Sequence, residues 1–173
     1  MGTPADPDKP NPQEISAPGK RRRQRTRRAH SSGGVAYRRH PTNGEIQIAL
    51  IATRGGERWQ LPKGSREAHE TSIQTAIREV EEEVGLRSEH EAFLRTIDYW
   101  YWDTYRRLEP ELVHKSVDFY LLRVVGGTLS DDSYEVDAVG WFSLAEAQAI
   151  LTFSGESEVL RLAQERLAAK GLT

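Results

Sequence analysis

Three glutamates near the middle of the chain have a spacing suited to binding a metal ion. On a helix, Glu79, Glu82 and Glu83 would project from one patch, because residues three and four apart are neighbours there. Carboxylates whose Cβ atoms are about 5–6 Å apart repel one another unless water or a cation screens them. Mg²⁺ and Mn²⁺ prefer oxygen ligands and often share them with a phosphate. The cluster predicts divalent-metal chemistry on a phosphate, with a solvated acidic helix face as the alternative.

An amphipathic helix over residues 71–84 would present these carboxylates. Its apolar residues recur at helical spacing and are Ile73, Ala76, Ile77, Val80 and Val84. Thr71 and Gln74 match a capping box at its start. Gly85 stands where a helix favours a left-handed stop. We therefore expect a buried apolar face and, on the other side of the helix, the acidic patch.

The spacing of these residues resembles the signature motif of the Nudix hydrolases. In this chain the motif reads, in order, Gly64, Glu70, Arg78-Glu79-Val80, Glu82-Glu83 and Gly85-Leu86, and every defined position matches. The lead-in WQLPKG at 59–64 is also similar to that of the family. The resemblance in fold covers about residues 32–170. It implies hydrolysis of a pyrophosphate bond in a nucleoside diphosphate that is linked to another group.

The resemblance implies that the acidic patch holds the metal. Glu79, Glu82 and Glu83 would bind Mg²⁺ or Mn²⁺. The backbone carbonyl of Lys63, just before the motif, would be a further ligand. The implied chemistry is a displacement at phosphorus in which the metal neutralises phosphate charge and lowers the pKa of the attacking water. No covalent intermediate is expected.

Other residues would position these ligands or take the proton of the water. By the same resemblance, Glu70 and Arg78 orient the carboxylates, and Gly64 lets the preceding loop approach the helix. Glu135 stands where the family often supplies another ligand or a base. The general base therefore remains open among three carboxylates, those of Glu82, Glu83 and Glu135.

An aromatic segment at 97–122 offers side chains for a nucleotide substrate. With residues 140–153, it resembles the Nudix members that hydrolyse diadenosine polyphosphates, in which a tyrosine follows the motif and a lysine enters the next strand. Tyr101 and Tyr105 bracket that tyrosine position, and their rings could stack on a base. Lys115 matches the lysine and could neutralise a distal phosphate. Packing in the core is the alternative for each ring.

Hydrolysis of diadenosine polyphosphates to mononucleotides is therefore the first expectation. Arg54 and Arg58 are candidate phosphate contacts, with a plain role in a turn as the alternative. Other possible activities are pyrophosphate removal from an RNA 5′ end or from a nucleoside triphosphate. A non-catalytic nucleotide sensor on the same fold is a further alternative. A sensor has no need of a full set of metal-binding acids, so we expect an enzyme.

The first part of the chain differs in charge from the rest. Eight basic and three acidic residues lie before residue 31, whereas the whole chain has a formal net charge of −2. We expect a disordered basic arm at 1–31, because it has too few large apolar residues to form a core. A Nudix domain would follow at 32–173. The run KRRRQRTRR at 20–28 could contact a nucleic acid weakly or act only as a solvated tail.

The remaining pattern indicates an α/β fold with a mixed sheet. Apolar and β-rich runs predict strands at 35–37, 46–52, 93–105, 117–125 and 139–142. Further helices are expected from Ser143 and over 156–169. Strands and helices that mix without strict alternation favour a mixed sheet with helices on its faces. The Nudix resemblance implies an α/β/α sandwich.

Composition excludes several classes of site. The chain has no cysteine, which rules out disulfides, cysteine-based zinc sites, iron–sulfur centres and a thiol nucleophile. No run approaches the ~18 apolar residues that cross a bilayer, and residues 1–12 lack the apolar core of a secretory signal. We therefore expect a cytoplasmic protein that makes no membrane contact.

Overall fold

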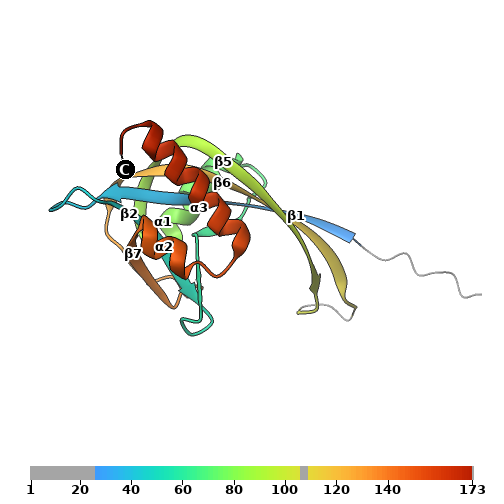
Figure 1. The fold of residues 1–173 in the computed structure, drawn as a ribbon. Helices are drawn as coiled ribbons and strands as arrows, with labels where there is room; N and C mark the ends of the chain where they lie inside the picture. The colour runs from blue at the N-terminus through green and yellow to red at the C-terminus, as the bar shows by residue number, and fades with distance from the viewer. Residues whose placement is uncertain (1–25, 106–108, 173) are drawn as a thin grey trace, which may run out of the picture.

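The computed structural model describes residues 26–105 and 109–172, which contain one mixed, seven-stranded sheet. The strands are β1 (Thr26–Arg39), β2 (Ile46–Thr53), β3 (Arg58–Gln60), β4 (Lys63–Ser65), β5 (Leu86–Asp103), β6 (Glu111–Gly127) and β7 (Ala138–Ser143). Their order is β3-β2-β1-β6-β5, with β4 paired to β1 and β7 paired to β2 (Figure 1). β1 and β6 run parallel, and the other pairs are antiparallel. The expectation of a mixed sheet is confirmed.

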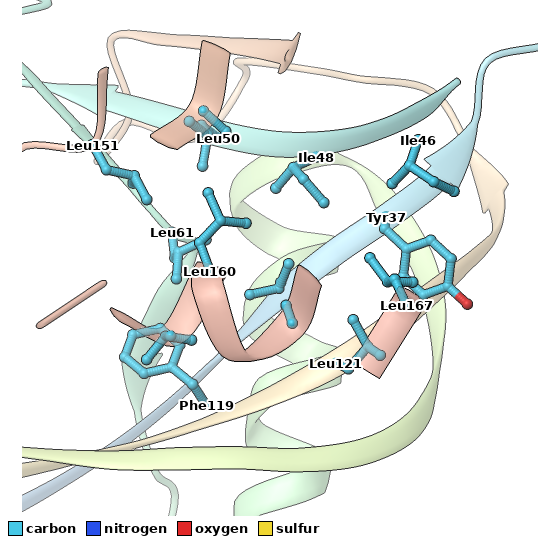
Figure 2. Packing of buried hydrophobic residues seen from close by; sticks show 14 of the residues in the cluster. Tyr37, Ile46, Ile48, Leu50, Leu61, Phe119, Leu121, Leu151, Leu160 and Leu167 are labelled. Atoms are coloured by element: carbon cyan, nitrogen blue, oxygen red, sulfur yellow. The ribbon is translucent and has the colours of Figure 1, made fainter. Parts of the chain in front are cut away.

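Among the described residues, helices α1 (Ser72–Val84), α2 (Leu144–Ile150) and α3 (Ser154–Ala169) cover the two faces of this sheet (Figure 1). Val80 of α1 packs in one apolar cluster with Ala36, and Leu160 of α3 packs in another with Val35 and Phe119. Figure 2 shows Leu160 and Phe119 in this second cluster. Neighbouring strand residues enter opposite clusters because side chains alternate along a strand. The α/β/α sandwich is thereby confirmed. None of these helices has the length and apolarity that a bilayer crossing requires.

α1 forms where the apolar period and the cap residues predict a helix. The Thr71 hydroxyl accepts the Gln74 backbone N–H at 3.2 Å, and the Gln74 side chain accepts the Thr71 N–H at 2.9 Å. Gly85 follows the helix in the left-handed region, at a φ of 77°, where a larger residue would be strained. Of the residues 71–84, only Thr71 lies outside the helix, as its N-cap.

β1 begins at Thr26, well before Ser32, where we expected order to start. Its partner is β6, and the parallel register places Thr26 opposite Leu112. Backbone hydrogen bonds to a neighbouring strand order this polar segment, and composition gives no sign of such a partner. Residues 26–31 are therefore strand rather than disordered arm. The expectation of disorder for residues 1–25 lies outside the described residues.

β5 and β6 are also longer than the strands expected at 93–105 and 117–125. They pair along nearly their whole length, which extends strand structure into segments that are not apolar. Together with β1 they run beyond the helices, toward the right of the view in Figure 1. One end of the sheet therefore projects past the sandwich.

The basic run at 20–28 is divided by the start of β1. Its last residues, 26–28, are strand, and the others lie outside the described residues. Arg27 donates to Asp103 of β5 at 2.9 Å and to Glu111 of β6 at 3.1 Å. This part of the run therefore helps to hold the projecting end of the sheet together.

Candidate active site

One face of α1 borders a cavity of about 700 Å³ whose lining includes four residues of the motif, Gly64, Glu79, Glu82 and Glu83. The cavity is lined by Lys63, Gly64, Ser65, Glu79, Glu82, Glu83, Lys115, Asp132, Ser133, Tyr134 and Glu135. Lys115 reaches it from β6, and Glu135 reaches it from the loop before β7. The fold thus brings a distant lysine and a distant carboxylate to the acidic patch of the helix. We call this the acidic cavity.

β4 contacts α1 through each of its three residues. The Ser65 carbonyl accepts Arg78 Nη2 at 2.9 Å, and Lys63 and Gly64 contact glutamates of the motif. Lys63 donates its backbone N–H to the Glu83 carboxylate at 2.9 Å. A Cβ atom on Gly64 would lie 2.1 Å from the carboxyl carbon of Glu79. β4 is held in this position by β1, because Gly64 pairs with Ser32. The lack of a side chain at Gly64 therefore makes the close approach possible.

Arg78 joins three of the four glutamates of the motif, Glu70, Glu79 and Glu82, into one ion-pair network. Its guanidinium donates to Glu70 through Nε at 2.6 Å and through Nη2 at 2.9 Å. Its Nη1 donates to Glu79 at 2.8 Å and to Glu82 at 3.0 Å. The bonds from Arg78 lower the pKa of Glu70 to about 2. Arg78 and Glu70 thus orient two carboxylates of the cavity.

Burial raises the pKa of two carboxylates in the acidic cavity. Glu79 and Glu83 are only 7% and 6% exposed. Loss of solvent raises the pKa of Glu83 to about 8, and it also raises that of Glu79. The charge of Glu135 adds to both shifts. Burial has the opposite effect on a lysine, and it lowers the pKa of Lys115 in the same cavity. A further cation in the acidic cavity would favour the charged form of both carboxylates.

The donor set fits a hard divalent cation. Four glutamates line the acidic cavity, and oxygen is the ligand type that Mg²⁺ and Mn²⁺ prefer. Within the described part of the chain, no three acidic or histidine side chains stand together at metal-ligand spacing. Arg78 is the cation between Glu79 and Glu82 in this structure. A bound divalent ion would favour the charged form of Glu83, which burial disfavours.

A second cavity of about 700 Å³ adjoins the first and shares Lys63 with it. Its lining includes three aromatic residues: Tyr99 on β5, the buried Phe119 on β6 and Phe153 before α3. The Arg58 guanidinium lies 5.7 Å from the centre of the Phe153 ring. The cavity therefore combines flat apolar surfaces with a cation, which suits a nucleoside that carries phosphates. We call it the aromatic cavity.

Glu156 of α3 ties the lead-in of the motif to the rest of the fold. This side chain is 4% exposed, and one of its oxygens accepts the Leu61 N–H at 2.9 Å. Its other oxygen accepts Lys63 Nζ at 3.0 Å, and that ammonium also donates to Gln60 at 2.7 Å. These bonds hold the segment whose next backbone N–H reaches Glu83. Glu156 therefore supports the acidic cavity without lining it.

The structure separates the predicted substrate residues into two groups. Lys115 lines the acidic cavity, and Arg58 lines the aromatic one. Tyr101 and Tyr105 belong to neither lining and are 38% and 87% exposed. Arg54 is an exposed turn residue with a φ of 53°, and it also lies outside both linings. Of these predicted substrate residues, only Lys115 and Arg58 therefore line one of the two cavities.

Several residues that line the cavities had no role in the sequence interpretation, among them Tyr99, Phe153 and Glu156. Tyr99 lies within the aromatic segment, where spacing from the motif favoured its neighbours. Phe153 closes the stretch whose resemblance to other Nudix members was noted. No sequence signal marks Glu156, because its bond to Leu61 joins residues that are 95 positions apart in the chain.

Comparisons with known proteins agree with the motif and the fold. A family model described as NUDIX domain matches residues 35–163. The chain is 40% identical over 147 residues to a Mycobacterium tuberculosis protein named putative mutator protein MutT4. This alignment covers 83% of this chain and 57% of that protein. It is 30% identical over 125 residues to the asymmetrical bis(5′-nucleosyl)-tetraphosphatase of Sus scrofa. This alignment covers 69% of this chain and 79% of that protein.

A solved structure shares the fold over most of the chain. The crystal structure of a C. elegans Ap4A hydrolase binary complex matches with a TM-score of 0.64 at 25% identity, over 82% of this chain and 98% of that one. The chain spans only 57% of the length of the M. tuberculosis protein. The family model covers most of the chain, and Gly64 and the three α1 glutamates of the motif line one cavity. The chain therefore belongs to the Nudix hydrolase family.

Proposed function

We propose that the chain hydrolyses a pyrophosphate bond within a nucleoside diphosphate linked to another group, with Mg²⁺ or Mn²⁺ as cofactor. One observation carries the proposal: four glutamates line the same cavity as Lys115, and they are Glu79, Glu82, Glu83 and Glu135. The carboxylates supply ligands of the kind that hard cations take, and the lysine supplies a cation for a phosphate. Both kinds of group are needed at a pyrophosphate bond.

The side chains of the acidic cavity would bind the substrate and handle the proton of the attacking water. Lys115 binds a phosphate oxygen by charge, from a partly buried position that limits competition by water. A divalent cation, when bound, neutralises phosphate charge and lowers the pKa of water. A carboxylate of the cavity accepts the water's proton, and the candidates are Glu82, Glu83 and Glu135. The bond from the attacked phosphorus to the bridging oxygen breaks, and this oxygen leaves with the other fragment.

The finer proposal is that the substrates are diadenosine polyphosphates, which yield mononucleotides. The aromatic cavity supports it, because Tyr99 and Phe153 offer ring faces to a base and Arg58 offers a cation to phosphates. Lys63 borders both cavities, so a nucleoside in one would have its phosphates directed to the other. Two related proteins are named bis(5′-nucleosyl)-tetraphosphatase and Ap4A hydrolase.

A substrate panel tests the reaction and the substrate separately. The full chain is assayed with diadenosine polyphosphates of several lengths, ADP-ribose, nucleoside triphosphates and 5′-triphosphate RNA, each with Mg²⁺ and with Mn²⁺. Products are identified by mass spectrometry. We expect metal-dependent turnover that is fastest for a diadenosine polyphosphate. Faster pyrophosphate release from RNA or a triphosphate would refute that substrate, and binding without turnover of any compound would make the chain a sensor.

Variants of Tyr99 test the aromatic cavity. Tyr99→Ala removes a ring that stacks on the base, so we expect KM for the preferred dinucleotide to rise about 10-fold with little change in kcat. Tyr99→Phe keeps the ring and should restore KM. KM measured on Tyr105→Ala tests the expectation drawn from the sequence, in which the ring of Tyr105 stacks on the base. An effect of Tyr105→Ala alone would place the base elsewhere.

A further inference from the structure

Glu156, in the first turn of α3, is buried although its side chain is ionisable. It is 4% exposed, and it lines the aromatic cavity rather than the acidic one. One carboxylate oxygen accepts the Leu61 N–H at 2.9 Å, and the other accepts the Lys63 ammonium at 3.0 Å. Such bonds offset the cost of burying a charge. Both oxygens are thus engaged within the protein, which favours a holding role over contact with a substrate.

The lead-in of the motif is held at alternate residues by the chain around the start of α3. The Trp59 N–H donates to the Thr152 hydroxyl at 3.0 Å, and the Trp59 carbonyl accepts the Thr152 N–H at 3.0 Å. Further along the lead-in, Leu61 and Lys63 both bond to Glu156. Alternate residues of an extended chain face the same side. One side of the lead-in is therefore bonded along its length, and Glu156 makes the last two of these contacts.

The packing of α3 gives Glu156 a fixed position. Val159 and Leu160, which follow it on the helix, are buried in an apolar cluster that also contains Leu61. Residues three and four positions apart are neighbours on a helix surface, so the carboxylate lies beside this packed face. The bond from Leu61 to Glu156 therefore joins two elements that the core already holds in place.

Pro62 carries this position on to the acidic cavity. Its ring restricts φ, and its carbonyl accepts the Gly34 N–H of β1 at 3.1 Å. Lys63 follows directly, and its backbone N–H donates to Glu83 at 2.9 Å. The link across the proline is therefore stiff. A displacement of the residue before the proline would move the Lys63 backbone relative to Glu83.

We propose that Glu156 is a positioning residue for the metal site of the acidic cavity. It holds the Lys63 backbone where the N–H of this residue bonds to Glu83 and where the adjoining carbonyl is available as a ligand. The inference rests on the proposed function, because it assumes a divalent cation in this cavity. Groups that orient metal ligands commonly change metal affinity by about 10–100-fold when they are replaced.

The charge of Glu156 offers a competing explanation, because a carboxylate attracts any nearby cation, whatever its effect on position. Two substitutions separate charge from position. Glu156→Asp keeps the charge but withdraws the carboxylate by one methylene, so that it no longer reaches both Leu61 and Lys63. Glu156→Gln keeps the length but loses the charge and one acceptor oxygen. Positioning predicts that both variants bind metal more weakly, whereas charge alone predicts a loss for Glu156→Gln only.

Mn²⁺ binding to the full chain without substrate tests the proposal. Free Mn²⁺ is measured by electron paramagnetic resonance during titration of wild type and of both variants. We expect Glu156→Asp and Glu156→Gln each to weaken Mn²⁺ binding by about 10-fold. A higher Mn²⁺ concentration should then restore the turnover of Glu156→Asp on the preferred substrate. The same addition should leave Glu83→Gln inactive, because that variant lacks a ligand itself.

Hydrogen exchange of the Lys63 amide, followed by NMR without metal, observes the positioned group directly. This N–H bonds to Glu83 in wild type, so it should exchange faster with solvent in Glu156→Asp. The Asp137 N–H, which bonds to the Ala52 carbonyl at 2.9 Å, serves as a reference and should exchange at the wild-type rate. An unchanged rate at Lys63 would contradict the proposed role.

Glu146→Asp is the matched control, because Glu146 also accepts a backbone N–H, from Ser143 at 2.8 Å, and lines neither cavity. It should bind Mn²⁺ as wild type does. Circular dichroism and thermal unfolding establish that each variant is folded, and a stability loss with unchanged Mn²⁺ affinity would make Glu156 merely structural and overturn the inference.

Two further outcomes would overturn the inference and leave the proposed activity standing. One is wild-type Mn²⁺ affinity in Glu156→Asp beside a loss in Glu156→Gln, because charge alone would then act. The other is a rise in KM at unchanged Mn²⁺ affinity, because Glu156 would then act on the nucleoside. A wild-type chain that binds no Mn²⁺ would refute the proposed function, and the inference with it.

Discussion

Gly64 and Glu79 approach each other so closely that a Cβ atom on residue 64 would lie 2.1 Å from the carboxyl carbon of Glu79. The two residues belong to different elements, β4 and α1. β4 is held by its pairing with β1, and α1 is held by its buried apolar face. A methyl group at residue 64 would therefore displace the Glu79 carboxylate, which is buried and bonded to Arg78 at 2.8 Å.

Gly64→Ala should therefore disturb both stability and activity. The added methyl group overpacks the contact with Glu79, so we expect a loss of about 1–3 kcal/mol in the free energy of unfolding. Displacement of the carboxylate should lower turnover by about 100-fold. Urea unfolding of Gly64→Ala, Glu79→Ala and the double variant forms a double-mutant cycle. The penalty of Gly64→Ala should shrink in the Glu79→Ala background, whereas strictly additive effects would contradict the steric explanation.

The carboxylates of α1 can be tested against a neighbour on the same helix. Glu82→Gln and Glu83→Gln each remove a charge that the metal-assisted reaction requires, so turnover should fall at least ~10³-fold. Glu81→Gln is the matched control, because Glu81 is exposed and does not line the acidic cavity. Thermal unfolding should show that all three variants fold. Near-normal turnover for Glu82→Gln and Glu83→Gln would refute the site.

Lys115 is predicted to bind a phosphate of the substrate. Lys115→Ala should raise KM by about 10-fold or more, because charged hydrogen bonds of this kind are worth about 1.5–3 kcal/mol. The rise in KM should be greater for dinucleotides with longer phosphate chains, because their additional phosphates can reach the Lys115 ammonium. Lys170→Ala is the control: Lys170 pairs with Glu91 outside the cavity. Equal losses for all chain lengths would show that Lys115 acts in another way.

The pair of Glu70 and Arg78 should make stability depend on pH in acid solution. The folded protein holds the pKa of Glu70 at about 2, below the ordinary value of 4.5. A lowered pKa stabilises the fold above the ordinary value, and this contribution is lost as the pH falls from there toward the folded pKa. Urea unfolding at a series of pH values should show a smaller acid loss for Glu70→Gln than for wild type. Parallel curves for the two proteins would contradict this.

The helix that carries the motif was predictable from the sequence because its determinants are local. The apolar period, the capping box at Thr71 and the left-handed stop at Gly85 all lie within the segment that they specify. The spacing of the glutamates follows from the helix itself. Resemblance to the Nudix motif added Lys63 and Glu135, and both line the acidic cavity.

The strands that complete the cavities were predicted less well. β1 begins at Thr26 because β6 runs beside it, and nothing in the polar sequence before Ser32 announces such a partner. The aromatic segment shows the same limit. Its rings were visible in the sequence, but the structure places Tyr99 at the aromatic cavity and Trp100 on the opposite face of the sheet.

By itself, the sequence determined the family, the acidic helix and the class of chemistry, since these depend on residues that are close together in the chain. The tertiary structure decided which distant side chains join them. Register between β5 and β6 assigns Tyr99 and Trp100 to different faces, and a shift of one residue would exchange them. The bond from Glu156 to Leu61 likewise exists only once α3 has packed on the sheet. Such contacts arise from the packing of whole elements, which short-range sequence patterns do not encode.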